Sequence, residues 1–293
     1  MPQINRILVA TDLSVPARHA AERAAMLSKE LQASLDLLYV ANLAPLERLG
    51  QMMAPQDDLL QRVLDAAREK LEQLGATLLQ RYDVAGGVRV LPGSVLTELT
   101  RQVDEMAINL LVCGARGESA VRHLLLGSTA QRLLSHMICP VLVVKQTPRR
   151  EYRTLLVPVD FSPSSLRAIR DARAIAPHAE ITLLHVFDAP FEGGLRFANV
   201  DADTLDHYRI IARKEATEKL YALREEAGLP PYATRLVTVH GDASWRIVEQ
   251  EQELDCDLIV MGKHGQSALQ ELLVGSVTKH VLAESQSDVL VSV

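Results

Sequence analysis

Short apolar runs alternate with longer segments that mix apolar and charged residues along the whole chain. The runs that end at Cys113 and Met261 are almost free of polar residues, which is typical of parallel strands buried on both faces. In the first half, strands are predicted at 4–11, 35–40, 86–91, 109–113 and 140–145, and helices at 15–32, 56–80, 94–105 and 127–136. This alternation predicts right-handed βαβ crossovers and an open, Rossmann-like parallel five-stranded sheet with helices on both faces.

The same pattern occurs twice. The segment Ile7–Ser14 matches Leu155–Ser162 at an offset of 148 residues. The offset falls to 146 where Leu37–Val40 matches Leu183–Val186, so the second copy is two residues shorter before its second strand. We therefore predict two tandem domains, 1–148 and 149–293, joined by a short polar linker. The stretches 41–55 and 187–203 are predicted to be loops that act as mobile flaps.

A frame of three glycines and a serine recurs at this offset, directly after an apolar strand in each copy. Because glycine lacks a Cβ, it lets backbone N–H groups come close to a ligand and allows positive φ. A strand, a glycine turn and a helix then form an anion cradle. The simpler alternative is that the glycines only permit tight turns, but recurrence of the whole frame favours phosphate binding. The frame residues are Gly114, Gly117, Gly127 and Ser128 in the first copy, and Gly262, Gly265, Gly275 and Ser276 in the second.

An acidic residue ends the first strand of each copy. Asp12 and Asp160 could accept hydrogen bonds from a base or a ribose, or they could only support the following helix. Ser14 and Ser162 already have the pattern of helix N-caps, with Pro163 at a first helical position. Both interpretations of the carboxylates stay open at this stage.

The two glycine loops differ in charge. The second contains Lys263 and His264, with no acid before Glu271, whereas Arg116 in the first is soon followed by Glu118. An anion is therefore predicted to prefer the second loop.

Composition excludes several classes of function. The 293 residues carry a net charge of −6 and only 4% aromatic residues, which does not fit a nucleic-acid-binding surface. No apolar run is long enough to span a membrane and the start lacks the pattern of a signal peptide, so we expect a cytoplasmic protein. The three cysteines have no pairing or metal-binding pattern and are expected to be buried, reduced thiols.

Catalytic signatures are missing too. Neither copy has a Ser/His/Asp arrangement, a recurring pair of carboxylates or the Gly-x-x-x-x-Gly-Lys-Ser/Thr loop of phosphate-hydrolysing proteins. Binding is therefore favoured over catalysis.

Taken together, the motifs resemble the universal stress protein family in its tandem form, over nearly all of the chain. The resemblance rests on Val-Ala-Thr-Asp12-Leu-Ser, Val-Pro-Val-Asp160-Phe-Ser, the two glycine frames and Cys139-Pro140 before the last strand of the first copy. The family fold is related to the adenine nucleotide α-hydrolases, and members with the complete frame generally bind ATP. The resemblance implies adenine near Asp12 and Val40, and near Asp160 and Val186, with phosphates on the frame residues; by themselves the valines indicate only a continuing core.

The resemblance also has implications for assembly. In the family, the last strand often forms an antiparallel dimer contact, which implies a pseudo-dimer of the two domains and a contact for a homodimer. Ser287-Asp288 replaces Cys-Pro in the second copy, a departure that bears on its edge pairing. Glu118 is a second departure, because the family commonly has a basic or small polar residue there.

The leading hypothesis is an ATP-binding stress-response regulator with slow or no ATP turnover, in which Mg²⁺ is held through the phosphates. One alternative is a tandem interaction module that binds proteins and no nucleotide. Another is an adenylate-handling enzyme, which lacks support because neither a His-Ile-Gly-His-type signature nor a Ser-Gly-Gly-x-Asp loop is present.

Overall fold

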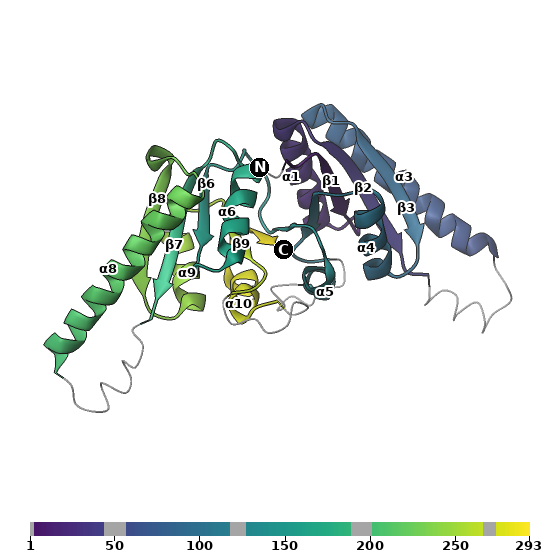
Figure 1. Ribbon diagram of the computed structural model, residues 1–293. Coiled ribbons are helices and arrows are strands. Elements are labelled where there is room, and N and C mark those ends of the chain that lie inside the picture. Colours follow the sequence, from purple (N-terminus) through teal and green to yellow (C-terminus); the bar gives the residue numbers. More distant parts are fainter. Residues whose placement is uncertain (1–2, 44–56, 118–126, 189–200, 266–273) are drawn as a thin grey trace. The chain divides into compact units, whose positions relative to one another are not determined.

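The computed structural model describes residues 3–43, 57–117, 127–188, 201–265 and 274–293. It divides into two compact units (Figure 1). Unit 1 comprises Met1–Glu151 with Asp288–Val291 and Val293, and unit 2 comprises Tyr152–Ser287 with Ser292. Most of the two predicted flaps lies outside the described residues.

Unit 1 is built on five parallel strands in the order β3-β2-β1-β4-β5. The chain starts in the middle of the sheet, moves outward to β3 and returns to β4, which creates a topological switch point between β1 and β4. The elements are β1 (Arg6–Ala10), α1 (Val15–Leu31), β2 (Ser34–Ala41), α3 (Asp57–Tyr82), β3 (Gly86–Pro92), α4 (Val95–Glu105), β4 (Leu110–Gly114), α5 (Ser128–His136) and β5 (Val141–Val144).

Unit 2 repeats this plan with parallel strands in the order β9-β6-β7-β8. Helix α6 has 13 residues where α1 has 17, and the shortening falls before β7, as the change of offset predicts. The elements are β6 (Thr154–Pro158), α6 (Pro163–Ile175), β7 (Glu180–Phe187), α8 (Ala202–Glu226), η1 (Pro231–Ala233), β8 (Thr234–His240), α9 (Ala243–Glu253), β9 (Leu258–Gly262) and α10 (Ser276–Glu284).

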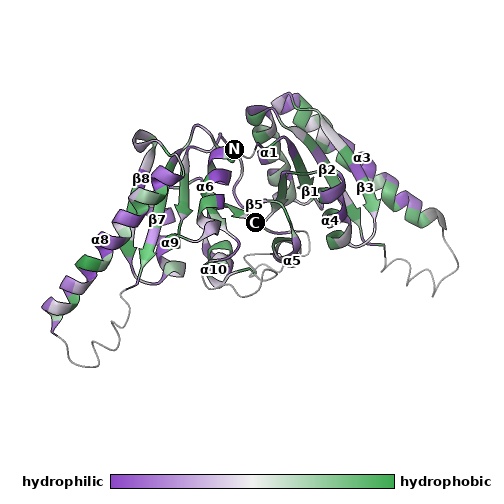
Figure 2. Cartoon of the chain, in the orientation of Figure 1, coloured by the Kyte–Doolittle hydropathy of each residue, from purple (hydrophilic) through white to green (hydrophobic). Residues whose placement is uncertain are grey.

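The predicted α/β fold is confirmed, with a mostly parallel sheet and helices on both faces. Its central strands are buried along their length: Leu8, Leu111, Leu156 and Ile259 are all inaccessible to solvent. Figure 2 shows these apolar strands beside helices on which apolar and polar residues alternate. The apolar runs are continuous because both faces of the sheet are covered.

In both copies, one side-chain oxygen accepts hydrogen bonds from two backbone N–H groups at the start of the first strand. In unit 1, Oδ1 of Asn109 accepts hydrogen bonds from the backbone N–H groups of Asn5 and Arg6, both at 3.0 Å. In unit 2, Oδ2 of Asp257 accepts from Arg153 at 2.8 Å and Thr154 at 3.1 Å. These acceptors tie each fourth strand to the first.

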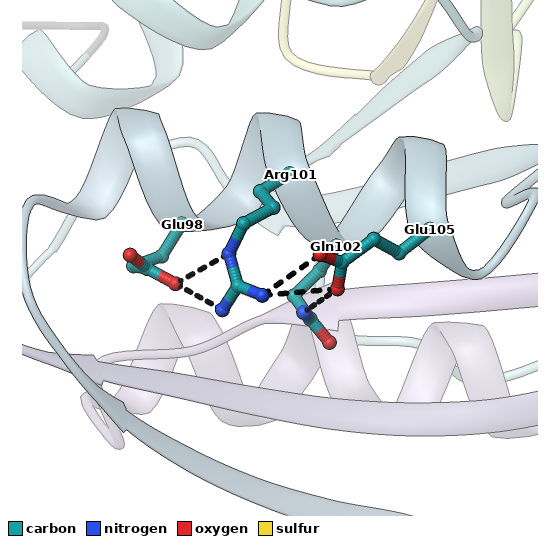
Figure 3. Close-up of polar contacts among 4 residues, drawn as sticks. All are labelled: Glu98, Arg101, Gln102 and Glu105. Atoms are coloured by element: carbon teal, nitrogen blue, oxygen red, sulfur yellow. Dashed lines mark hydrogen bonds and ion pairs between the residues drawn. The ribbon is translucent and has the colours of Figure 1, made fainter.

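Helix α4 carries a polar network on its surface (Figure 3). Arg101 lies between Glu98 and Glu105, with nitrogen–oxygen distances of 2.6 and 2.9 Å, and Gln102 donates to Glu105 at 2.8 Å. Because the arginine is largely exposed, solvent screens these pairs and their contribution to stability is small. The network thus links successive turns of the helix.

The departure from Cys-Pro is accommodated by a buried carboxylate in unit 2. Glu251 on α9 is 2% exposed, and its Oε1 accepts hydrogen bonds from the N–H groups of Gln286 at 2.8 Å and Ser287 at 2.6 Å. The Ser287 hydroxyl donates to the carbonyl of Cys256 at 2.7 Å. Val103 holds the corresponding place in the first copy, so this polar anchor is particular to the second.

Replacing Glu251 by Ala should therefore destabilise unit 2, because the N–H groups of Gln286 and Ser287 lose their acceptor. The expected loss is about 2–4 kcal/mol. The midpoint of urea unfolding, followed by the fluorescence of the single tryptophan, Trp245 on α9, measures it. Glu249→Ala on the exposed side of the same helix is the control and should shift the midpoint little. Equal shifts in both variants would contradict the anchoring role of Glu251.

Candidate functional site

Both glycine frames connect the carboxyl end of a strand to the start of a helix, as predicted. Strands β4 and β9 end at Gly114 and Gly262, and Gly127 and Gly275 are the N-cap residues of α5 and α10. The N–H of Gly127 donates to the carbonyl of Ala115 at 2.8 Å, and that of Gly275 donates to Lys263 at 3.0 Å. Each loop is therefore closed by its own backbone at the helix N-terminus, where Ser128 or Ser276 begins the helix.

Glycine is needed at Gly114 and Gly262 because neighbouring atoms lie too close for a Cβ, and not because of a positive φ. A Cβ on Gly262 would lie 2.8 Å from the Cβ of Ser164, and one on Gly114 would lie 3.0 Å from the carbonyl group of Pro16. The expectation of positive φ is wrong for the frame glycines, none of which has a φ in the left-handed range. Left-handed φ values of 65° and 64° occur instead at Leu13 and Phe161.

The acidic residues hold the turn from the first strand into the first helix. Oδ1 of Asp12 accepts from the N–H of Ser14 at 3.0 Å, and Oδ1 of Asp160 accepts from the N–H of Ser162 at 3.1 Å and the hydroxyl of Ser165 at 2.8 Å. The second carboxylate oxygen faces the glycine loop. A Cβ on the second glycine of each frame, Gly117 or Gly265, would lie 2.5 or 2.7 Å from that oxygen.

The predicted N-caps occupy the expected positions. Ser14 precedes α1 and accepts from the N–H of Ala17 at 3.4 Å. Ser162 precedes α6, whose first residue is Pro163, but its hydroxyl makes no capping hydrogen bond. In unit 2 the Asx turn of Asp160 thus provides the side-chain support that Ser162 does not. The aspartates have a structural role on one oxygen and face the loop with the other.

In unit 2 the predicted site residues line one cavity of about 1000 Å³ at the carboxyl edge of the sheet. The lining also includes residues that the sequence analysis did not identify as site residues, among them Phe161, His185, Glu215, Lys219 and Ile247. These five come from the turn after β6, from β7, from α8 and from α9. The predicted residues on its wall are Asp160, Val186, Gly262, Gly265, Gly275 and Ser276.

The cationic groups at this cavity differ from those expected. His264 lines it, but Lys263 is only 8% exposed and is not part of the lining, and its backbone closes the loop. Lys219 on α8 reaches the cavity instead, with Nζ 6.0 Å from the centre of the Phe161 ring. In the sequence, Lys219 is one charge among many on an amphipathic helix, so only the fold distinguishes it.

His185 and Phe161 form an aromatic wall of the same cavity. Their ring centres are 4.3 Å apart, and Nδ1 of His185 lies 2.8 Å from the carbonyl oxygen of Val159. Since a carbonyl only accepts, Nδ1 carries the proton in this contact. Burial lowers the pKa of His185, while the hydrogen bond to Val159 and the nearby Asp160 act in the opposite direction. Leu13 and Tyr39 stand at the corresponding positions of the first copy.

In unit 1, Asp12, Val40, Gly114, Gly117 and Gly127 also lie at the carboxyl edge, where the strands and loops above end. A cavity of about 640 Å³ in this unit is formed by other residues, from the ends of β2 and β3 and from α4 and α5. They include Asn42, Pro92, Gly93, Ser94, Thr129 and Arg132. Arg116 is exposed, whereas Glu118 and Glu271, on which the charge comparison partly depends, lie outside the described residues.

The described residues offer no reactive thiol and no cluster of metal-binding side chains. The three cysteines are buried and unpaired with one another, and burial raises the pKa of each thiol to about 12, so thiolates do not form near neutral pH. Among the residues described, no three His, Cys, Asp or Glu side chains group as a metal site. No helix in these ranges has the length and apolarity that a membrane crossing requires.

Acid should destabilise unit 2 through His185. Its folded-state pKa is lowered, so below about pH 6.5 the unfolded chain binds protons that the folded chain resists, and stability falls as pH falls. When the pH is lowered from about 7.5 to 5, the urea midpoint of the wild type should fall more than that of His185→Gln. Trp245 fluorescence follows the unfolding. His178→Gln, at an exposed position, should behave as the wild type. An unchanged pH dependence in His185→Gln would contradict this assignment.

Known proteins resemble this chain in both halves. The model of the universal stress protein family matches residues 3–145 and again 151–292. Universal stress proteins MJ0531 and MJ0577 of Methanocaldococcus jannaschii are 27% and 29% identical over alignments that cover 50% and 48% of this chain and 84% and 94% of those proteins. The structure of a universal stress protein from Archaeoglobus fulgidus has the same fold, with 21% identity, a TM-score of 0.71 and 99% of each chain covered. The chain therefore belongs to the universal stress protein family and contains two tandem domains of that family.

Proposed function

We propose that the protein binds ATP and acts in the cytoplasm as a nucleotide-responsive regulator of the stress response, with slow or no ATP turnover. The observation that carries the proposal is the meeting of Asp160, Val186 and the second glycine frame on one cavity of unit 2.

The cavity suits a nucleotide in size and in the distribution of its polar groups. Its volume of about 1000 Å³ is at the upper end of the range for small-molecule sites, roughly 300–1000 Å³. One side has the N-terminus of α10 at Gly275 and Ser276, whose N–H groups and helix dipole favour phosphate. Asp160 and Val186 line the same cavity. The carboxylate of Asp160 would accept a hydrogen bond from a base, and the backbone at Val186 would offer a donor or an acceptor.

Basic side chains near the cavity support an anionic ligand. Lys219 and His264 both belong to the lining, where Glu215 and Asp188 also occur. With mixed charges in the wall, the backbone N–H groups at the start of α10 would hold most of the phosphate charge. Magnesium prefers oxygen ligands and commonly binds through substrate phosphates, so we propose that Mg²⁺ enters with ATP.

Slow turnover is consistent with the side chains available. Asp160 is a lining carboxylate that faces Gly265, but its Oδ1 already accepts hydrogen bonds from Ser162 and Ser165. A residue held in this way supports a turn and a ligand better than it activates water.

The two units are proposed to differ in affinity, with unit 2 the stronger site. Phe161, His185 and Lys219 enlarge the contact surface of the unit 2 cavity. The first copy has Leu13 and Tyr39 in place of Phe161 and His185.

A tandem interaction module without nucleotide is the second candidate. It is favoured by the tight packing of Gly262 on Ser164 and of Gly114 on Pro16, which gives these glycines a structural reason of their own. The two functions differ in what the purified protein binds.

Matched substitutions at the two N-cap glycines test the nucleotide proposal. Gly275 and Gly127 have φ values of −59° and −69°, and aspartate is a good N-cap residue, so both helices should tolerate Gly→Asp. The new carboxylate at position 275 should repel phosphate and weaken ATP binding about tenfold or more, which corresponds to roughly 1.4 kcal/mol. Isothermal titration with Mg²⁺-ATP, and analysis of nucleotide released on denaturation, measure the effect.

The Gly127→Asp variant is the internal control and should retain most of the wild-type affinity if unit 2 is the stronger site. A larger loss in Gly127→Asp than in Gly275→Asp would contradict the ranking of the units. If the wild type carries no nucleotide and fails to bind ATP at millimolar concentration, the nucleotide proposal is wrong and the interaction module is favoured.

A further inference from the structure

A buried ion pair lies at the edge of the unit 1 sheet, where the last strand of the chain, β10 (Asp288–Ser292), is attached. Asp288 is inaccessible to solvent and Arg23 on α1 is 5% exposed. Nε of Arg23 lies 3.5 Å from Oδ2 of Asp288, and Nη1 donates to the carbonyl of Arg150 at 2.7 Å. Burial of both charges makes each depend on the other.

The other oxygen of Asp288 holds the end of β5. Its Oδ1 accepts hydrogen bonds from the N–H groups of Lys145 at 2.8 Å and Gln146 at 3.0 Å, the two residues that follow β5. One carboxylate thus contacts α1 by charge and the end of β5 by hydrogen bonds.

The two strands that pair at this edge, β5 and β10, occupy equivalent positions in the two copies of the repeat. Strand β10 runs antiparallel to β5, with Leu290 opposite Leu142 and Val289 opposite Val143. Leu290 and Leu142 are equivalent in the repeat, because 148 residues separate them. The β5 strand of a second copy would therefore fit the same edge in the same register, with Leu142 opposite Leu142.

The difference between these two strands lies at the position of Asp288. The first copy has Pro140 there, which has no carboxylate. With β5 of a second copy on this edge, Arg23 would be buried without the counter-ion that Asp288 supplies, and the N–H groups of Lys145 and Gln146 would lose their side-chain acceptor. A buried charge without a partner is strongly unfavourable.

The pairing of two β10 strands from different copies is also disfavoured. Asp171 on α6 occupies the position that Arg23 has on α1. By the symmetry of the repeat, this arrangement would bring Asp288 of one copy towards Asp171 of the other. Two carboxylates would then take the place of an ion pair.

We propose that Arg23 and Asp288 make the β5 edge of unit 1 selective for the C-terminal strand of its own chain, and exclude β5 of a second copy. The partner that the edge recognises is an extended apolar strand with a carboxylate at its first residue. Charge specifies the partner here, because the apolar residues of β5 and β10 are nearly interchangeable.

Cysteine cross-linking distinguishes the two pairings in the full-length protein. Leu142→Cys/Leu290→Cys should form a disulfide within one chain, since these positions are directly opposite. Leu142→Cys alone forms a covalent dimer only when two β5 strands pair. We expect almost no covalent dimer from it on non-reducing gels, and at least a tenfold larger dimer fraction when Asp288→Pro, which copies the first repeat, is added.

Asp288→Asn, which removes the charge with little change of shape, should raise the dimer fraction to a smaller extent, and light scattering over a range of concentrations should show the same order. Asp104→Asn, at an exposed position of unit 1, is the control and should have no effect. The proposal is overturned if Leu142→Cys alone gives mainly covalent dimer, because two β5 strands would then pair although Asp288 is still present. It is also overturned if both Asp288 variants give the dimer fraction of the control.

Discussion

The close approach of each glycine loop to the first helix of its unit is the constraint on which the carboxyl edge depends. Gly262 leaves no room for a Cβ beside Ser164, and Gly114 leaves little beside Pro16. This packing brings the second glycine of each frame against an aspartate that is held by its own Asx turn. The left-handed backbone at Leu13 and Phe161 is part of the same turn. Strain of this kind persists only where the surrounding structure enforces it, and it recurs in both units.

The two copies of the repeat have the same glycine frame on the same backbone, but different side chains surround it. In unit 2, an aromatic pair and a lysine from α8 join the frame residues around one cavity. The pair consists of residues directly after and before predicted ligand positions: Phe161 follows Asp160 and His185 precedes Val186. Small changes beside a shared frame therefore give the two units different residues around the frame, without any change in the strand order.

The second copy has Ser287-Asp288 where the first has Cys139-Pro140, and two buried carboxylates make contacts at this point. Glu251 takes over the hydrogen bonding of the segment that enters β10, and Asp288 connects β10 to Arg23 and to the end of β5. In each case, a buried carboxylate accepts hydrogen bonds from two backbone N–H groups. Strand β10 runs antiparallel to β5, and ionic and polar contacts that the Cys-Pro sequence of the first copy does not provide hold it there.

The sequence alone determined the order of strands and helices, because continuous apolar runs are needed for strands covered on both faces and the repeat doubles the evidence for each element. The family resemblance of its motifs implied that Asp160, Val186 and the second glycine frame lie around one ligand, and parallel strands do place their carboxyl ends at one edge. The sequence did not identify Lys219, Phe161 or His185 as cavity residues, or the partnership of Arg23 with Asp288. Those relations join positions far apart in the chain. Their side chains have the same local pattern as other charged or apolar residues, so only tertiary packing decided which of them are buried and which groups they contact.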